Sequence, residues 1–348
     1  MLIVDGGRIG AYHRASKRCE KSAIRKGGDG YVRTESILPG SMKKRKTYTR
    51  VELKENAQLW LMMLPTIALI LVFSYIPMYG ILIAFQKYLP GKDIIGPNAA
   101  RWVGLANFRK FVSSVYFPRI LRNTVILSLY SLAFGFLAPI LFALLLDQIR
   151  ALRFKKFLQT VSYMPHFIST VVVVGMVCSF IYTDGLITQF LTIFGLPAKN
   201  YRMDSGAFRI IYTATKVWQG FGWGSILYVA TISGISPQLY EAAKLDGANR
   251  WQQVWHITLT GLRPIIAINL IMSIGGILSS DSSFIQLLYQ PATYEVSDVL
   301  GTYIYRLGIE EGQYSLTTAA GLFMSLIGFA LTFTANKLSD WLTGYALW

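Results

Sequence analysis

The feature that most constrains the fold of this chain is a series of long, uncharged apolar runs. The first reads LWLMMLPTIALILVFSYIPMYGILIA over residues 59–84. Such runs extend over on the order of 17 to 25 residues, which is the length of helix that crosses a bilayer, whereas a helix on a soluble core alternates apolar and polar faces. The chain is therefore predicted to be an integral membrane protein, and its composition, 53% apolar over 348 residues, agrees with that class.

Six of these runs are predicted to be transmembrane spans, which makes the fold an all-α membrane bundle. Their expected ranges are 59–84, 121–146, 164–182, 208–233, 262–280 and 316–335. We expect the transmembrane domain to occupy residues 59–348.

Residues 1–58 form a polar segment whose basic clusters are Arg14, Lys17, Arg18, Lys21, Arg25, Lys26 and Lys43, Lys44, Arg45, Lys46. This composition is typical of a disordered tail, and the segment lacks the short apolar stretch of a secretory signal. It is interpreted either as a tether to anionic lipids or as an unselected leader. Because Lys and Arg beside a first span resist translocation, the N-terminus is expected in the cytoplasm, and six spans return the C-terminus there.

The loops between the spans bear only in part on this orientation. Loops 147–163 and 234–261 would be cytoplasmic and are both positive, as expected. The external loop 85–120 is basic as well, so the orientation rests mainly on the N-terminal segment.

The loop between the fourth and fifth spans has a distinct local pattern. Ser236 before Pro237 is a helix-start signal, because a hydroxyl can cap free N–H groups and Pro needs no donor at the first position. Gly247 allows the backbone to turn, and Trp251, Val254, Trp255 and Leu259 then follow at helical spacing. A helix, a bend and a second helix are predicted, suited either to a groove on a partner protein or to the membrane surface.

Glu241-Ala242-Ala243, Gly247 and Ile257-Thr258-Leu259 have the spacing of the EAA loop, and the chain resembles the permeases of binding-protein-dependent ABC importers. In that family the loop is a coupling helix that docks on the ATPase. The resemblance therefore implies ATPase contact by Glu241, Ala242, Ala243, Asp246 and Gly247, and Arg250 is added as a charge that can fix the register. The motif's final Pro is Thr260 here, and Pro264 was expected to replace it as the break before the fifth span.

The resemblance to the polysaccharide and oligosaccharide branch of this family extends over most of residues 59–340. It rests on Phe73-Ser74-Tyr75-Ile76-Pro77-Met78-Tyr79-Gly80, Trp102-Val103-Gly104-Leu105-Ala106-Asn107-Phe108, Arg122-Asn123-Thr124, Ser162-Tyr163-Met164-Pro165-His166-Phe167 and Tyr314-Ser315-Leu316-Thr317-Thr318-Ala319-Ala320-Gly321. It implies a type I importer fold in the bacterial cytoplasmic membrane.

The same resemblance implies a set of partners for this multi-pass subunit. They are a second related permease, an ATPase dimer, an extracytoplasmic solute-binding protein and the lipid bilayer; no nucleic acid is expected. The chain has no G-x-x-x-x-G-K-[ST] run, so ATP and Mg are expected on the partner ATPase and no enzymatic activity on this chain.

Unusual residues in the fourth and fifth spans are candidates for the substrate pathway, because sugars need aromatic faces and hydrogen-bonding groups. They are Lys216, Trp218, Gln219, Trp223, Tyr228 and Asp281. The alternatives are that the aromatic residues are interface anchors and that Lys216 snorkels or forms a structural ion pair, with Asp281 as a possible partner. Glycines 220, 222 and 224 are expected to allow close helix packing.

Two further questions concern cargo and class. The basic external segments suggest an acidic saccharide such as a uronate from alginate or pectin, or else an acidic patch on the binding protein. The competing class is a secondary transporter or channel that works without an ATPase.

Neither a metal site nor a disulfide is expected. Three dispersed histidines (His13, His166, His256) argue against a metal site, and Cys19 and Cys178 are not expected to form a disulfide.

Overall fold

The structure, a computed structural model, describes residues 50–278 and 281–347 and divides into two units, residues 1–68 and 69–348. The predicted tail lies outside the described residues up to position 49, as does Cys19. Helix α2 begins at Arg50 and ends at Ile70, so residues 50–58, which were assigned to the tail, are helical. This stretch, RVELKENAQ, contains neither Gly nor Pro and is rich in good helix formers.

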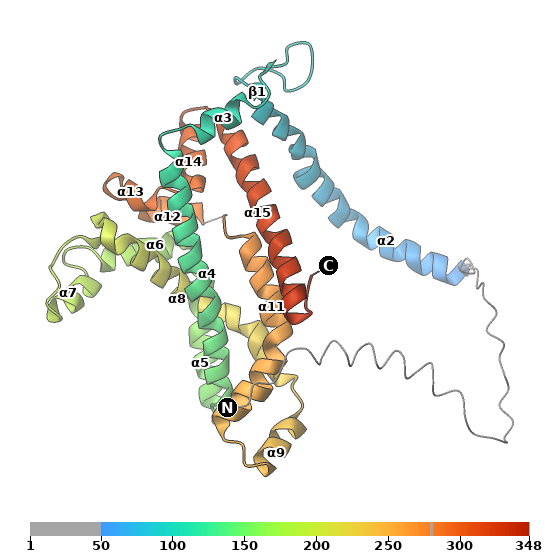
Figure 1. Cartoon of the computed structure of the whole chain (residues 1–348), viewed down its shortest axis with the longest axis vertical. Helices are drawn as coiled ribbons and strands as arrows, with labels where there is room; N and C mark the ends of the chain where they lie inside the picture. The colour runs from blue at the N-terminus through green and yellow to red at the C-terminus, as the bar shows by residue number, and fades with distance from the viewer. Residues whose placement is uncertain (1–49, 279–280, 348) are drawn as a thin grey trace. The chain divides into compact units, whose positions relative to one another are not determined.

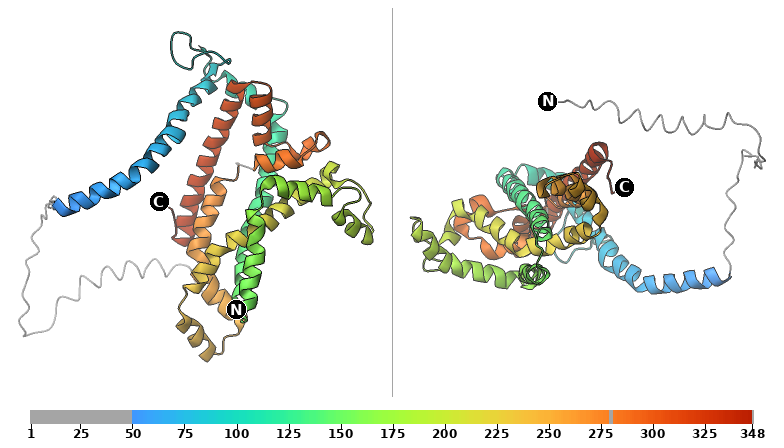
Figure 2. Two further views of the ribbon diagram at one scale, coloured as in Figure 1. Left: turned by 180° about the vertical axis from the view of Figure 1, so that it is seen from behind. Right: turned by 90° about the horizontal axis from the view of Figure 1, so that it is seen from below.

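The second unit is mostly helical (Figures 1 and 2). Its first part contains η1 (Leu71–Tyr75), η2 (Ile76–Phe85), the hairpin β1 (Gln86–Lys87) and β2 (Arg101–Trp102), α3 (Ala106–Val112), α4 (Phe117–Asp147), α5 (Leu152–Tyr163), η3 (Met164–Phe167), α6 (Thr170–Phe180), α7 (Leu186–Ile193) and η4 (Tyr201–Met203). Its second part contains α8 (Ser205–Ser233), α9 (Pro237–Leu245), α10 (Arg250–Gln253), η5 (Val254–Thr258), α11 (Leu259–Gly275), α12 (Ser282–Leu288), η6 (Pro291–Thr293), α13 (Tyr294–Ser297), α14 (Leu300–Tyr305), η7 (Arg306–Glu310) and α15 (Tyr314–Thr343).

Four helical segments within the described residues are long and apolar enough to cross a membrane. They are Ala57–Phe85, Phe117–Asp147, Arg250–Gly275 and Tyr314–Trp341, and they contain the predicted first, second, fifth and sixth spans except for residues 276–280. The regular helix of the fifth span ends at Gly275, earlier than predicted. The sixth span is part of a longer helix, which extends to Thr343.

Residues 164–182, predicted as the third span, do not form one continuous helix. Segments Leu152–Phe167 and Thr170–Phe180 form a bent pair with an angle of 99° between them, and only together do they qualify as a fifth span. Pro165 lies at the start of a short 3-10 turn, Met164–Phe167, and Ile168 after it is extended. The Ser169 side chain then accepts a hydrogen bond from the backbone N–H of Val172 to start a new helix. A helix cannot continue through such a break because Pro lacks an N–H and the cap restarts the hydrogen-bond series.

The predicted fourth span, 208–233, lies within the continuous helix α8, yet α8 is not among the segments that qualify by length and apolar composition. It carries Lys216, Gln219 and several glycines where a lipid-facing helix would carry Leu or Val. Polar residues at this depth are tolerated when they face the protein interior or a water-filled cavity. Helix α8 packs along α4 (Figure 1), and this pair forms the frame of the cavity described below.

Two of the three glycines of α8 that were expected to allow close packing do so. A Cβ built on Gly222 would collide with the backbone carbonyl of Ser162 in α5, and one on Gly224 would touch Pro139 of α4. The expectation was wrong for Gly220, which has open space around it.

Gly222→Ala is expected to lower stability by about 2 kcal/mol, because overpacking against a backbone atom forces helices apart. Gly220→Ala is the matched control and is expected to be neutral or slightly stabilising, since Ala is the better helix former. Thermal unfolding of the two purified variants measures the difference. Equal melting temperatures for both would contradict the close contact of α5 and α8.

Candidate functional site

Helix α9 ends in a regular glycine-terminated turn. Gly247 has φ = +79°, the left-handed region that favours glycine. Its N–H donates to the carbonyl of Lys244, and the N–H of Ala248 donates to the carbonyl of Ala243 at 2.8 Å. This pair of bonds is a Schellman motif, which satisfies carbonyls that the helix end leaves free. The bend predicted at Gly247 is therefore confirmed.

The second helix begins with a capping box at Asn249. The Asn249 side chain accepts from the N–H of Gln252 at 2.9 Å, while the Gln252 side chain accepts from the N–H of Asn249 at 2.7 Å. The two helices are also joined by a 3.0 Å hydrogen bond between the hydroxyls of Tyr240 and Thr258. Burial raises the pKa of the Tyr240 phenol, so this hydroxyl stays protonated and able to bond at neutral pH.

Two details of the predicted loop differ from the structure. Helix α9 begins at Pro237 with Ser236 at its N-cap position, but the Ser236 side chain makes no capping hydrogen bond. Pro264 does not act as a break, because it lies inside α11, and the helical segment runs from Arg250 to Gly275 through the π-helical turn η5. Helix α11 continues through Pro264 although this residue has no N–H to donate to the carbonyl of Thr260.

The α9 segment presents an exposed surface at the end of the second unit opposite α3 and the β1–β2 hairpin (Figure 1). Of the candidate residues, Ala243 is half-buried and the others are exposed; they are Glu241, Ala242, Asp246, Gly247 and Arg250. Leu245, at the end of α9, is 90% exposed. The segment therefore combines small and charged residues on an accessible surface.

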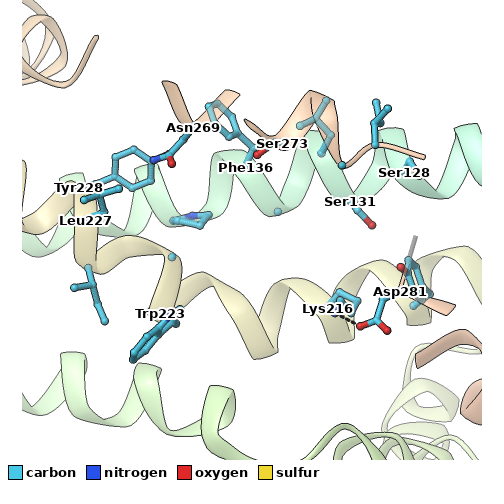
Figure 3. A pocket seen from close by; sticks show the side chains of 18 of the residues that line it. Ser128, Ser131, Phe136, Lys216, Trp223, Leu227, Tyr228, Asn269, Ser273 and Asp281 are labelled. Atoms are coloured by element: carbon cyan, nitrogen blue, oxygen red, sulfur yellow. Dashed lines mark hydrogen bonds and ion pairs between the residues drawn. The ribbon is translucent and has the colours of Figure 1, made fainter. Parts of the chain in front are cut away.

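A cavity of about 840 Å³ lies between α4, α8 and α11 in the second unit (Figure 3). Four of the six candidate pathway residues line it: Lys216, Trp223, Tyr228 and Asp281. Lys216 and Tyr228 are twelve positions apart on α8, so they lie about 18 Å apart along its axis at 1.5 Å rise per residue. The cavity is thus long enough for an extended ligand.

The charged end of the cavity is an ion pair. Lys216 Nζ lies 2.8 Å from Asp281 Oδ2, and the two side chains are 31% and 36% exposed. Among the residues described as lining the cavity, these two are the charged ones. No group of three His, Cys, Asp or Glu side chains over 50–278 and 281–347 is arranged to hold a metal ion.

Three candidate residues of α8 contact other elements of the unit: Tyr228, Trp223 and Gln219. The amide of Asn269 donates to the Tyr228 hydroxyl at 3.4 Å across the cavity. The ring of Trp223 stacks on His166 with centroids 4.6 Å apart and so contacts the α5–α6 bend. Gln219 donates to the backbone carbonyl of Ile168 in the same bend, and neither Gln219 nor Trp218 is among the residues that line the cavity.

The sequence reading missed the polar residues that α4 and α11 contribute, namely Ser128, Ser131, Asn269 and Ser273. Ser128 and Ser131 are spaced i, i+3 and Asn269 and Ser273 i, i+4, so each pair shares one helix face. Such pairs of polar residues within an apolar span were the sequence signal that could have identified this part of the cavity wall. The Ser128 hydroxyl is buried behind the cavity wall and has no hydrogen-bond partner among the described residues.

A second charged group, centred on Asp298, was also missed. Asp298 is fully buried, and its carboxylate accepts from Arg119 at 3.1 Å, Arg306 at 2.9 Å and the Thr302 hydroxyl at 2.8 Å. The Asn123 side chain donates to the backbone carbonyl of Asp298 at 3.2 Å. The group ties the start of α4 to α13, α14 and η7, near the end of the unit that carries α3.

Three comparisons bear on what such a molecule is. Residues 135–344 match the family described as "Binding-protein-dependent transport system inner membrane component". The chain is 40% identical over 298 residues to the polygalacturonan/rhamnogalacturonan transport system permease protein YteP of Bacillus subtilis (strain 168), covering 85% of this chain and 92% of that relative. It is 37% identical to Protein LplB of the same organism, covering 82% and 90%.

Solved structures give the same picture. The structure is similar, with a TM-score of 0.76 and 39% identity, to a chain of a bacterial ABC transporter involved in the import of the acidic polysaccharide alginate, covering 84% of this chain and 98% of that chain. A bacterial alginate ABC transporter in complex with alginate pentasaccharide-bound periplasmic protein matches with a TM-score of 0.77 and 38% identity, covering 85% and 99%. The chain therefore belongs to the family of binding-protein-dependent transport system inner membrane components, the membrane-spanning permease subunits of ABC importers.

Proposed function

We propose that this permease subunit imports acidic oligo- or polysaccharide, and that the cavity along α8 is the pathway through it. The observation that carries the proposal is the cavity itself, which is long, is lined by hydroxyl, amide and aromatic groups, and contains the Lys216 cation. Lys216, Trp223, Tyr228 and Asp281 act as pathway residues at the cavity, and Gln219 bonds α8 to the α5–α6 bend. The relatives' cargoes, polygalacturonan and alginate, are acidic polymers.

ATP hydrolysis in the partner is coupled to transport through the exposed α9 segment. In this proposal Glu241, Ala242, Ala243, Asp246, Gly247 and Arg250 contact the partner ATPase, which binds ATP and Mg. Exposure of the charged members and the two hydrogen bonds of the Schellman turn support such a docking element. A rigid element transmits a partner's movement better than a flexible loop does, because less of the movement is absorbed within the loop.

The complete importer comprises a second related permease, an ATPase dimer and an extracytoplasmic solute-binding protein in the cytoplasmic membrane of a bacterium. The similarity to a transporter solved with its periplasmic protein supports this assembly. Residues 59–348 form the permease domain and residues 1–58 a cytoplasmic segment that precedes it.

Six spans with both termini in the cytoplasm are the proposed topology. Four apolar helical segments, the bent pair and α8 together supply the six. Helix α15 begins beside α3 and ends toward the α9 end of the unit (Figure 1), which supports a C-terminus on the side of the coupling segment.

ATPase activity of the purified five-subunit complex tests this function. A panel of uronic-acid and neutral oligosaccharides of equal length is supplied with the binding protein. We expect uronic-acid oligosaccharides to stimulate ATP hydrolysis at least about tenfold more than neutral ones. Equal stimulation by both would contradict the acidic cargo, and failure of this subunit to purify with an ATPase would contradict the importer assembly.

A further inference from the structure

The charge in the cavity consists of a cation that is already paired with an acid on a different helix. Lys216 lies on α8 and Asp281 sits at the N-cap of α12, and these are the charged groups among the cavity-lining residues that the structure describes. We propose that the pair is a carboxylate-exchange site: Lys216 leaves Asp281 and binds the carboxylate of an acidic sugar as that sugar passes. This inference rests on the proposed function and assigns the step at which the negative charge of the cargo is recognised.

Lys216 is able to take a second carboxylate. An ammonium group has three N–H donors, and one of them is directed at Asp281 Oδ2. The side chain is about one third exposed to the open cavity, and Nζ lies 5.4 Å from the centre of the Phe284 ring. A flexible four-carbon stem lets the ammonium move toward a new partner while its aliphatic part stays packed.

Asp281 is able to release Lys216 without losing all of its contacts. Its Oδ1 accepts the backbone N–H of Phe284 at 3.1 Å, which caps α12. Its side chain is also about one third exposed in the same open cavity, so water can solvate the oxygen that Lys216 leaves. The carboxylate therefore keeps a charge-assisted hydrogen bond throughout the exchange.

The ion pair between Lys216 and Asp281 explains how Lys216 can bind an acidic sugar selectively and still release it. A lysine without a counter-ion would hold a carboxylate tightly, whereas competition with Asp281 weakens the complex and returns Lys216 to its first partner when the sugar moves on. A neutral sugar offers no carboxylate, so the pair stays closed to it. Polar groups further along the wall, the Tyr228 and Ser273 hydroxyls and the Asn269 amide, serve either class of sugar.

If the ion pair between Lys216 and Asp281 were purely structural, its removal would have different effects on transport and stability. It would fix α12 against α8, where Phe284 contacts Tyr212 with ring centroids 5.5 Å apart. Its removal would then affect every cargo equally and would lower the stability of the complex.

Two variants separate these possibilities. Asp281→Asn removes the counter-ion but keeps a good N-cap residue on α12. Lys216→Met with Asp281→Asn removes both charges and leaves no unpaired charge in the cavity. Each is incorporated into the complete importer with its binding protein, and uptake is measured for a uronic-acid oligosaccharide and for its carboxyl-reduced, neutral counterpart.

We expect Asp281→Asn to lower KM for the acidic oligosaccharide about tenfold and to lower kcat, because the cargo is held more tightly. The double variant should lose about tenfold or more of its acidic uptake, and the ratio of acidic to neutral uptake should fall toward one. A raised KM in Asp281→Asn, or equal loss of both cargoes in the double variant, would overturn the exchange. Should the wild-type complex take up neither sugar with ATP, the proposed function itself fails.

Discussion

Glu241→Lys is expected to abolish coupled transport while leaving the subunit folded and inserted. Glu241 is exposed on α9 in the segment proposed to dock on the ATPase. Reversing a charge in such a contact sets like charges against each other, at a cost of several kcal/mol. Import should fall at least about hundredfold, measured as ATP-driven uptake in proteoliposomes.

Glu310→Lys is the matched control. Glu310 is also exposed and ends η7, far along the chain from α9, so the same change in net charge should leave coupling near the wild-type level. Thermal unfolding of both variants checks that the fold is retained. If Glu241→Lys transports as well as Glu310→Lys, α9 does not dock on the ATPase through this residue.

The second large effect is expected from Asp298→Asn. The carboxylate is fully buried and neutralises the guanidinium groups of Arg119 and Arg306, which are 32% and 21% exposed. Without it two cations face each other across a buried amide. Breaking a buried pair by removing one partner costs about 3 kcal/mol or more, so the apparent melting temperature in detergent should fall markedly.

Asp340→Asn is the control for that loss, because Asp340 is exposed near the end of α15 and exposed substitutions usually change stability by less than about 0.5 kcal/mol. Replacing Arg119 and Arg306 by Met together with Asp298→Asn should recover part of the loss, since no unpaired charge remains. An Asp298→Asn variant as stable as Asp340→Asn would show that the group contributes little.

What could be predicted from the sequence was local along the chain. Apolar run length identified the spans around α2, α4, α11 and α15 because a lipid-facing helix is defined by its own composition. The turn at Gly247 was equally local, since a positive φ favours that residue type. The bend at residues 164–170 was missed because the span was assigned on hydropathy, although Pro165 was present to signal it.

The site depended on contacts that no local pattern records. Lys216 and Asp281 are 65 residues apart, and Asn123 meets Asp298 over 175 residues. Both pairs form only when α4, α8 and the segments after α11 pack together. Helix α8 was recognised as unusual through Lys216, yet which helices approach it at Gly222 and Gly224 is visible only in the folded structure.

The most direct test of the central claim is uptake of a labelled uronic-acid oligosaccharide into proteoliposomes that contain the complete importer and its binding protein. The account predicts accumulation against a gradient when ATP is enclosed with the ATPase subunits, and none with a non-hydrolysable analogue. Accumulation at the same rate without ATP hydrolysis would contradict it and would favour a secondary transporter or channel.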